Sequence, residues 1–175
     1  NARPLVGWFT RTAEGRRSGF RVVEEAPSRL ASRLEAGEIA CGLLSSVELF
    51  RQPSFGYVPG VGISADGPVE SVRLFSRAPL DRVRRVALDT SSLTSVALLK
   101  ILLHRQVGVR PEYVPMAPDG ASMLSACDAA LLIGDRGFAP VGEASEVHDL
   151  GAMWKSFTGL PFVYALWIGP RAELD

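Results

Sequence analysis

The sequence has few of the residues that build metal centres or disulfide frameworks. Its 175 residues include only two cysteines and two histidines. Cys41 and Cys127 stand far apart, and neither has a second cysteine or a histidine at the spacing of a metal-ligand pair. The sequence therefore predicts no zinc site and no disulfide framework, and we interpret both cysteines as buried, reduced packing residues.

An excess of charge of one sign is also missing. Nineteen basic side chains balance nineteen acidic ones, and neither kind is gathered into a long block. This balance argues against nucleic acid or an anionic membrane surface as the main partner. The sequence also has no apolar run long enough to cross a membrane and no visible secretory signal, so we expect a cytoplasmic protein that binds a small molecule.

The segment from Asp89 to Leu103 carries the strongest local pattern. Five hydroxyl side chains precede an apolar run with helical spacing: Thr90, Ser91, Ser92, Thr94 and Ser95, then Val96, Leu98, Leu99, Leu102 and Leu103. The short apolar run 86–88 before them predicts a buried strand, so the unit is strand, hydroxyl-rich turn and helix. The free N–H groups of the first helical turn suit a carboxylate or phosphate. The alternative is an ordinary helix cap among surface serines.

Strands and helices are predicted to alternate along the chain, which is typical of α/β proteins with mostly parallel sheets. Predicted strands are 20–24, 39–44, 113–116 and 129–133, predicted helices are 26–36, 47–50, 121–127 and 147–157, and 11–19 is a predicted loop. Ligands gather outside the carboxyl ends of such strands. Ser45, Ser46 and Asp135 follow strands there, although Asp135 is also a plausible cap of the following turn.

Two further extended segments, 69–76 and 160–168, bracket the block that contains the hydroxyl-rich turn. They favour a two-lobed protein with a two-strand hinge and a ligand cleft between the lobes. The first lobe is expected to comprise 1–76 and 160–175, and the second lobe 77–159.

Six segments, in this order, carry a family resemblance. They are N-A-R-P-L-V at 1–6, S-S-V-E at 45–48, D-G-P-V-E-S-V-R-L-F-S at 66–76, S-x-x-T-S-V-A-L-L at 91–99, L-I-G-D at 132–135 and D-L-G-x-x-W-K-x-x-T-G-L-P-F-V at 149–163. The sequence resembles the chorismate dehydratase family, which opens the futalosine route to menaquinone. The resemblance implies a periplasmic-binding-protein type II-like fold. It also implies a chain that is incomplete at both ends, because the family has a strand before the first motif and a helical stretch after the last.

The resemblance also implies the site residues. Asn1 and Ser71 would touch the reacting part of chorismate, while Ser45, Ser92, Thr94 and Ser95 would hold its carboxylates. Asn1 and Ser71 are neither strong acids nor strong bases, so hydrogen bonding and orientation are expected to dominate, with a substrate carboxylate accepting the proton. No metal or other cofactor is implied.

Arg73 is a further candidate ligand contact, because a regular strand would place it on the same face as Ser71. Two alternatives remain open. One is a non-catalytic solute-binding protein for a small carboxylate, and the other is the sister enzyme 1,4-dihydroxy-6-naphthoate synthase. The G-P-V-x-S and T-G-L-P-F-V motifs resemble the dehydratase more closely. The sequence fixes no oligomeric state.

Overall fold

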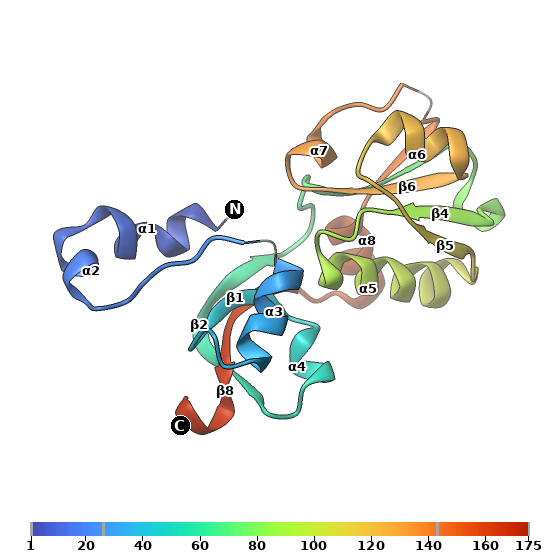
Figure 1. The fold of residues 1–175 in the computed structure, drawn as a ribbon. Helices are drawn as coiled ribbons and strands as arrows, with labels where there is room; N and C mark the ends of the chain where they lie inside the picture. Colours follow the sequence, from blue (N-terminus) through green and yellow to red (C-terminus); the bar gives the residue numbers. More distant parts are fainter. Residues whose placement is uncertain (1, 26, 143, 175) are drawn as a thin grey trace.

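The computed structural model describes residues 2–25, 27–142 and 144–174, which form two lobes with one β-sheet each (Figure 1). The first lobe contains a three-stranded sheet of order β1-β8-β2, and the second a five-stranded sheet of order β5-β4-β6-β3-β7. The α/β class and the two-lobed arrangement predicted from the sequence are confirmed.

The first-lobe sheet is formed by β1 (Gly42–Ser45), β2 (Phe55–Ala65) and β8 (Phe162–Pro170), and the central β8 runs antiparallel to both neighbours. Helix α3 (Pro27–Glu35) packs on this sheet, and the short α4 (Glu48–Arg51) follows β1. The core of the lobe is small and comprises Ala31, Leu34, Leu44, Phe55 and Ile168. Helices α1 (Arg3–Arg11) and α2 (Ala13–Arg17) lie to one side of the sheet (Figure 1).

The second-lobe sheet has a parallel centre and antiparallel neighbours. Its strands are β3 (Val72–Ser76), β4 (Arg85–Leu88), β5 (Glu112–Pro115), β6 (Ala129–Ile133) and β7 (Glu146–Asp149). Its helical segments are η1 (Leu80–Arg82), α5 (Leu93–Leu102), a π-helical turn η2 (Leu103–Val107), α6 (Gly120–Ala126), α7 (Asp135–Phe138) and α8 (Leu150–Thr158), and a last turn η3 (Arg171–Glu173) follows β8 in the first lobe. Strand β4 is parallel to β5 and β6, while β3 is antiparallel to β6 and β7.

The prediction of mostly parallel sheets was wrong. Of the six strand pairings among the described residues, only β4 with β5 and β4 with β6 are parallel. Parallel neighbours need a long crossover, and the unit β4-α5-β5-α6-β6 supplies two of them. The chain enters the second lobe through β3, which is antiparallel to β6. The last strand of the lobe, β7, is antiparallel to β3, so the sheet is mixed.

Successive residues of the second-lobe strands face opposite sides of the sheet, as strand geometry requires. Leu74, Val86 and Leu131 belong to one core, which α5 and α8 complete. The residues that follow them, Phe75, Ala87 and Leu132, belong to a second core with α6. Figure 1 accordingly shows α5 and α8 on one side of the sheet and α6 on the other.

Several element predictions are corrected by the structure. The predicted loop 11–19 contains α2, which begins because Thr12 accepts a hydrogen bond from the N–H of Gly15. The predicted strand 20–24 has no regular secondary structure and pairs with no strand in the described part of the chain. The predicted helix 147–157 starts as β7 and becomes helical only after Asp149, whose side chain caps α8.

The two predicted crossing strands each lie in one sheet. Residues 72–76 form β3 of the five-stranded sheet, whereas the sequence grouped them with the first lobe, and 162–170 form β8 of the three-stranded sheet. The chain passes between the two sheets in two non-strand connections, 66–71 before β3 and 159–161 before β8. The connection 66–71, called the crossing loop below, carries Ser71.

Candidate active site

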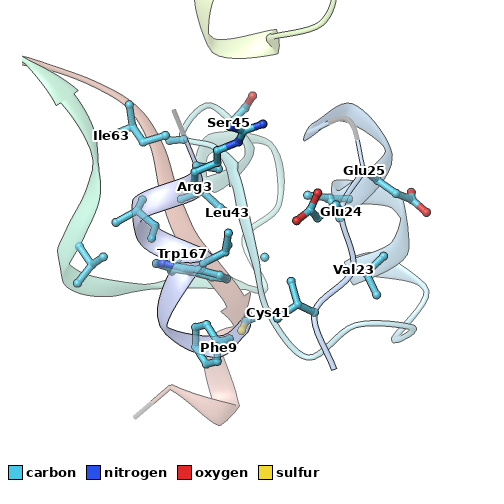
Figure 2. A pocket seen from close by; sticks show the side chains of 18 of the residues that line it. Arg3, Phe9, Val23, Glu24, Glu25, Cys41, Leu43, Ser45, Ile63 and Trp167 are labelled. Carbon is cyan, nitrogen blue, oxygen red and sulfur yellow. The ribbon is translucent and has the colours of Figure 1, made fainter. Parts of the chain in front are cut away.

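A cavity of about 1450 Å³ lies between the lobes and is lined from both of them. The first lobe contributes residues of β1, β2 and β8, including Ser45, Ile63 and Tyr164. The second lobe contributes the crossing loop, the hydroxyl-rich turn and Gly134 after β6. The cavity also runs along the unpaired edge of β1 toward α1, and Figure 2 shows Ser45 near one end and Phe9 with Cys41 near the other.

Four of the predicted site residues line this cavity together: Ser45, Ser71, Ser92 and Ser95. Ser45 is the last residue of β1, and Ser92 and Ser95 stand at the start of α5. The hydroxyl-rich turn follows β4, which has parallel neighbours, so the rule for parallel sheets applies to it. Ser45 lies in the same cavity although its strand β1 pairs antiparallel with β8. Ser91 of the same turn lines the cavity as well.

The hydroxyl-rich turn is held in one conformation by its own side chains. The N–H of Ser91 donates to Oδ1 of Asp89 (2.9 Å), and the N–H of Ser95 donates to Oγ of Ser92 (3.3 Å). Oγ of Ser95 donates to the same Ser92 oxygen (3.0 Å). Because Ser92 Oγ already accepts twice, its own proton is left to donate outward. The turn therefore offers a hydroxyl donor beside the N-terminus of a ten-residue helix, which suits a carboxylate.

Thr94 and Ser46, two other predicted site residues, are absent from the cavity lining and join the lobes instead. Oγ1 of Thr94 lies 3.5 Å from Oγ of Ser46 and accepts a 3.3 Å hydrogen bond from the N–H of Val47. Ser46 Oγ also donates to the carbonyl oxygen of Val163 (2.7 Å). These bonds connect the end of β1 to the start of α5 and so fix the spacing of the two lobes at the cavity.

Ser71 is 5% exposed and is held tightly by its backbone. Its N–H donates to the carbonyl oxygen of Val69 (2.7 Å), and its carbonyl oxygen accepts from the N–H of Gly134 (2.8 Å). A Cβ at Gly137 would lie 2.8 Å from that same carbonyl oxygen, so the first turn of α7 approaches Ser71 as closely as glycine permits. The Ser71 hydroxyl makes no hydrogen bond to the described residues, and Ser71 lines the cavity.

The crossing loop is anchored to α8 by Asp149. Both carboxylate oxygens accept from the N–H of Val69 (3.1 Å each), Oδ2 accepts from Glu70, and Oδ1 accepts from Ala152 at the start of the helix (3.0 Å). A Cβ at Gly151 would collide with the carbonyl oxygen of Gly67, so a side chain there would displace the loop. Asp149 and Gly151 thus set the position of the segment that carries Ser71.

The remaining predicted site residues lie elsewhere. Asp135 is exposed at the start of α7, and Arg73 lies in β3 opposite Leu132 and Asp149; neither lines the cavity. The expected alternation from Ser71 to Arg73 fails because β3 begins only at Val72 and Glu70 has a left-handed backbone, with φ of 59°. Asn1 lies outside the described residues.

Tyr164 is a cavity residue that the sequence did not single out. It is 7% exposed, and its hydroxyl oxygen is buried without a hydrogen-bond partner among the described residues. Loss of solvation on burial, and then the negative charge of Asp149, raise the pKa of the phenol far above its usual range. The sequence signal for Tyr164 was a hydroxyl inside the apolar run 160–168. The signal for Asp149 was its place directly before a predicted amphipathic helix, where aspartate is a common cap.

Neither a membrane-spanning helix nor a metal-binding cluster is found among the described residues. No helix in the described part of the chain is long and apolar enough to cross a membrane. Within the same residues, no group of three or more histidine, cysteine, aspartate or glutamate side chains is arranged to hold a metal ion.

The two lobes with a cavity between them define a periplasmic-binding-protein type II-like fold. A solved protein of Archaeoglobus fulgidus superposes with a TM-score of 0.56 at 19% identity, over 86% of this chain and 56% of its own. The periplasmic aliphatic sulphonate binding protein SsuA of Escherichia coli superposes with a TM-score of 0.55 at 19% identity, over 84% of this chain and 53% of its own. These likenesses show the fold.

Sequence comparison identifies the family. A family model described as menaquinone biosynthesis matches residues 1–173, and the chain belongs to that family. The chorismate dehydratase of Thermus thermophilus is 40% identical over 171 residues, which is 87% of this chain and 62% of that relative. The chain therefore spans less than two thirds of the length of this curated relative.

Proposed function

We propose that the protein is a chorismate dehydratase, a carbon–oxygen lyase that removes water from chorismate to give 3-[(1-carboxyvinyl)oxy]benzoate. The observation that carries this proposal is the meeting of Ser71 with the hydroxyl-rich turn in one cavity, in a chain that belongs to the menaquinone-biosynthesis family. The 40% identity to the dehydratase of Thermus thermophilus supports the same activity.

The reaction needs orientation more than strong catalytic groups. A ring proton and the ring hydroxyl leave chorismate, the ring becomes aromatic, and one water is formed. Aromatisation supplies the driving force, but other eliminations and rearrangements of chorismate are also downhill. The protein must therefore hold chorismate in one geometry and exclude the others, which a fixed set of hydrogen bonds from the cavity wall achieves.

The lining hydroxyls divide into two groups in this proposal. Ser45 and Ser92 donate to the substrate's carboxylates, at the helix terminus where negative charge is stabilised, and Ser95 orients the Ser92 hydroxyl by donating to its oxygen. Ser71, on the crossing loop, contacts the reacting part of the ring. Asn1 is proposed to contact the same part of the substrate. A substrate carboxylate accepts the ring proton, and the hydroxyl leaves with the electron pair of its carbon–oxygen bond.

Ser46 and Thr94 contribute through the lobe contact rather than through the substrate. Their hydrogen bonds span the two lobes beside the cavity, so they fix the distance between Ser45 and the start of α5. We further propose that the lobe boundaries lie in the connections 66–71 and 159–161. We assign no substrate contact to Arg73 or Asp135.

The direct test incubates the protein, in its full natural length, with chorismate and follows the ultraviolet spectrum and the product mass. We expect an aromatic product lighter than chorismate by one water. Tight binding of chorismate without conversion would contradict the proposal and favour a solute-binding protein of this fold. A dihydroxynaphthoate product from a later pathway intermediate, with chorismate untouched, would identify the sister enzyme instead.

A further inference from the structure

A guanidinium group reaches the cavity and has no role in the site proposed above. Arg3, at the start of α1, lines the cavity together with Ser45. In Figure 2 its side chain extends from α1 toward the end of the cavity where Ser45 lies. Arg3 is exposed, so a ligand in the cavity can contact its guanidinium. A permanent positive charge therefore stands near a hydroxyl that is proposed to bind a carboxylate.

Packing of α1 against the first lobe holds Arg3 at this end of the cavity. The ring of Phe9 meets that of Trp167 in β8, with centroids 6.3 Å apart. An α-helix rises by about 1.5 Å per residue, so Arg3 lies about 9 Å along the axis of α1 from Phe9. Figure 2 accordingly shows Phe9 toward one end of the cavity and Arg3 toward the other.

The charge of Arg3 is not neutralised by the protein. Within residues 2–25, 27–142 and 144–174, Arg3 forms no ion pair with any carboxylate. Two carboxylates of the cavity lining, Glu25 and Glu38, both pair with Arg33, at 2.8 and 2.9 Å. A further lining carboxylate, that of Glu24, makes no ion pair with Arg3 either. The guanidinium is therefore available to an anionic ligand.

Two other arginines of the cavity lining lie toward the opposite end. Arg11 is the last residue of α1, eight residues and about 12 Å along the helix from Arg3. Arg21 directly follows Phe20, whose ring meets that of Phe9 with centroids 5.7 Å apart. Of these three arginines, Arg3 is therefore the one placed to share a ligand group with Ser45.

The two carboxylates of chorismate have different tasks in the proposed reaction. The enolpyruvyl ether is attached to the ring carbon that loses its proton, so the enolpyruvyl carboxylate is the one near enough to accept that proton. A guanidinium bound to this carboxylate would lower its basicity more than a neutral hydroxyl would. The ring carboxylate takes no part in the proton transfer. A full positive charge can therefore hold it without slowing the reaction.

We propose that Arg3 binds the ring carboxylate of chorismate, with Ser45 as a second donor to the same group. This assignment rests on the proposed dehydratase activity. A guanidinium donates two parallel hydrogen bonds to one carboxylate, which fixes the orientation of that carboxylate and of the ring attached to it. The ring carboxylate keeps its charge throughout the reaction. The contact is therefore about equally strong in the ground state and the transition state, and it acts on binding rather than on turnover.

The test compares Arg3→Gln and Arg3→Lys with Arg17→Gln, each in the protein of full natural length. Steady-state dehydration of chorismate gives kcat and KM. Isothermal titration with the product, which retains the ring carboxylate and is not consumed, gives a dissociation constant. Arg17 is an exposed arginine of α2 that does not line the cavity, so it is a matched control.

We expect Arg3→Gln to raise KM and the dissociation constant by about ten- to a hundredfold, with kcat changed by less than about threefold. Arg3→Lys keeps the charge but loses the paired hydrogen bonds, so its values should lie between those of Arg3→Gln and the wild type. Arg17→Gln should behave as the wild type. The thermal midpoint should be unchanged in all three variants, because both arginines are exposed.

Other results overturn the assignment in distinguishable ways. Wild-type KM and product affinity in Arg3→Gln would remove Arg3 from the site and leave the dehydratase proposal standing. A change in kcat beyond about threefold would place the guanidinium at the carboxylate that accepts the proton, not at the ring carboxylate. An equal loss of binding in Arg17→Gln would show a general effect of charge. A wild type that forms no dehydrated product would overturn the proposed activity and this assignment with it.

Discussion

The backbone N–H of Glu70 donates a 2.6 Å hydrogen bond to Oδ2 of Asp149, 79 residues further along the chain. Glu70 adopts a left-handed backbone conformation that non-glycine residues rarely occupy, and it directly precedes Ser71. The bond to Asp149 compensates for this conformation and fixes the direction in which the crossing loop enters the cavity. The reacting side of the proposed site is thus positioned by the residue that ends β7 and caps α8.

Removal of the Asp149 carboxylate should affect stability and turnover together. Asp149→Ala leaves the N–H groups of Val69, Glu70 and Ala152 without their acceptor, so we expect a loss of about 1–3 kcal/mol in the free energy of unfolding. Turnover of chorismate should fall because the Ser71 loop is released. Urea unfolding and steady-state kinetics measure the two effects.

Asp119→Ala is the control for this variant. Asp119 caps α6 by accepting from the N–H of Ser122 (2.8 Å), and it does not line the cavity. Its loss should destabilise the protein by about 1 kcal/mol without changing kcat. Equal losses of turnover in the two variants would show that Asp149 acts through general stability alone.

Ser71→Ala should lower turnover far more than binding. The hydroxyl is proposed to contact the reacting part of the substrate, and its loss leaves the backbone bonds of Ser71 intact. We expect kcat to fall by about ten- to a hundredfold with a smaller change in the dissociation constant of chorismate. Ser125→Ala, on the exposed face of α6, should behave as the wild type. A wild-type rate in Ser71→Ala would refute the assignment.

Ser92→Asp separates helix capping from carboxylate binding. Aspartate caps a helix as well as serine does, so the free energy of unfolding should change by less than about 0.5 kcal/mol. A negative charge at the same position should repel a substrate carboxylate and weaken chorismate binding by at least about tenfold. Isothermal titration with chorismate and urea unfolding give the two numbers. Undiminished binding in Ser92→Asp would mean that the turn holds no carboxylate.

Stability at alkaline pH should report the environment of Tyr164. The pKa of its phenol is raised in the folded protein, so above about pH 10 the unfolded chain binds fewer protons than the folded one. The free energy of unfolding must therefore fall as pH rises above 10. Tyr164→Phe should show a shallower fall, while Tyr113, whose pKa is also raised by burial, contributes equally in both proteins. Parallel curves for wild type and variant would contradict the buried state of the Tyr164 hydroxyl.

The parts of the molecule that sequence reasoning reached are those that local chemistry determines. The hydroxyl-rich turn and α5 follow from neighbouring residues, since Ser92 caps the helix that its own sequence predicts. Strand direction does not follow in this way, because β3 pairs with β6 and β7, which come more than fifty residues later. The alternation of predicted strands and helices therefore predicted the α/β class correctly, but it did not predict that the second-lobe sheet is mixed.

The same distinction holds within the site. Ser45, Ser92 and Ser95 were indicated by their own segments and Ser71 by the family resemblance, and all four meet in the cavity. Tyr164 stands out only because its buried hydroxyl finds no partner among the described residues, and Asp149 only because it accepts from backbone N–H groups of the crossing loop. Thr94 was expected to bind substrate, yet its hydroxyl meets Ser46 and Val47, a contact that no local pattern describes.

The motif D-L-G at 149–151 positions the crossing loop, because any side chain at position 151 would collide with it. Asp149 draws the crossing loop toward the start of α8, and the bare backbone of Gly151 decides how near it can come. One carbon atom added at this position would collide with the carbonyl oxygen of Gly67 and displace the crossing loop that carries Ser71. The absence of a side chain at Gly151 therefore sets how closely the crossing loop approaches α8. Even Gly151→Ala, a substitution outside the cavity, would change the position of the site residue on that loop.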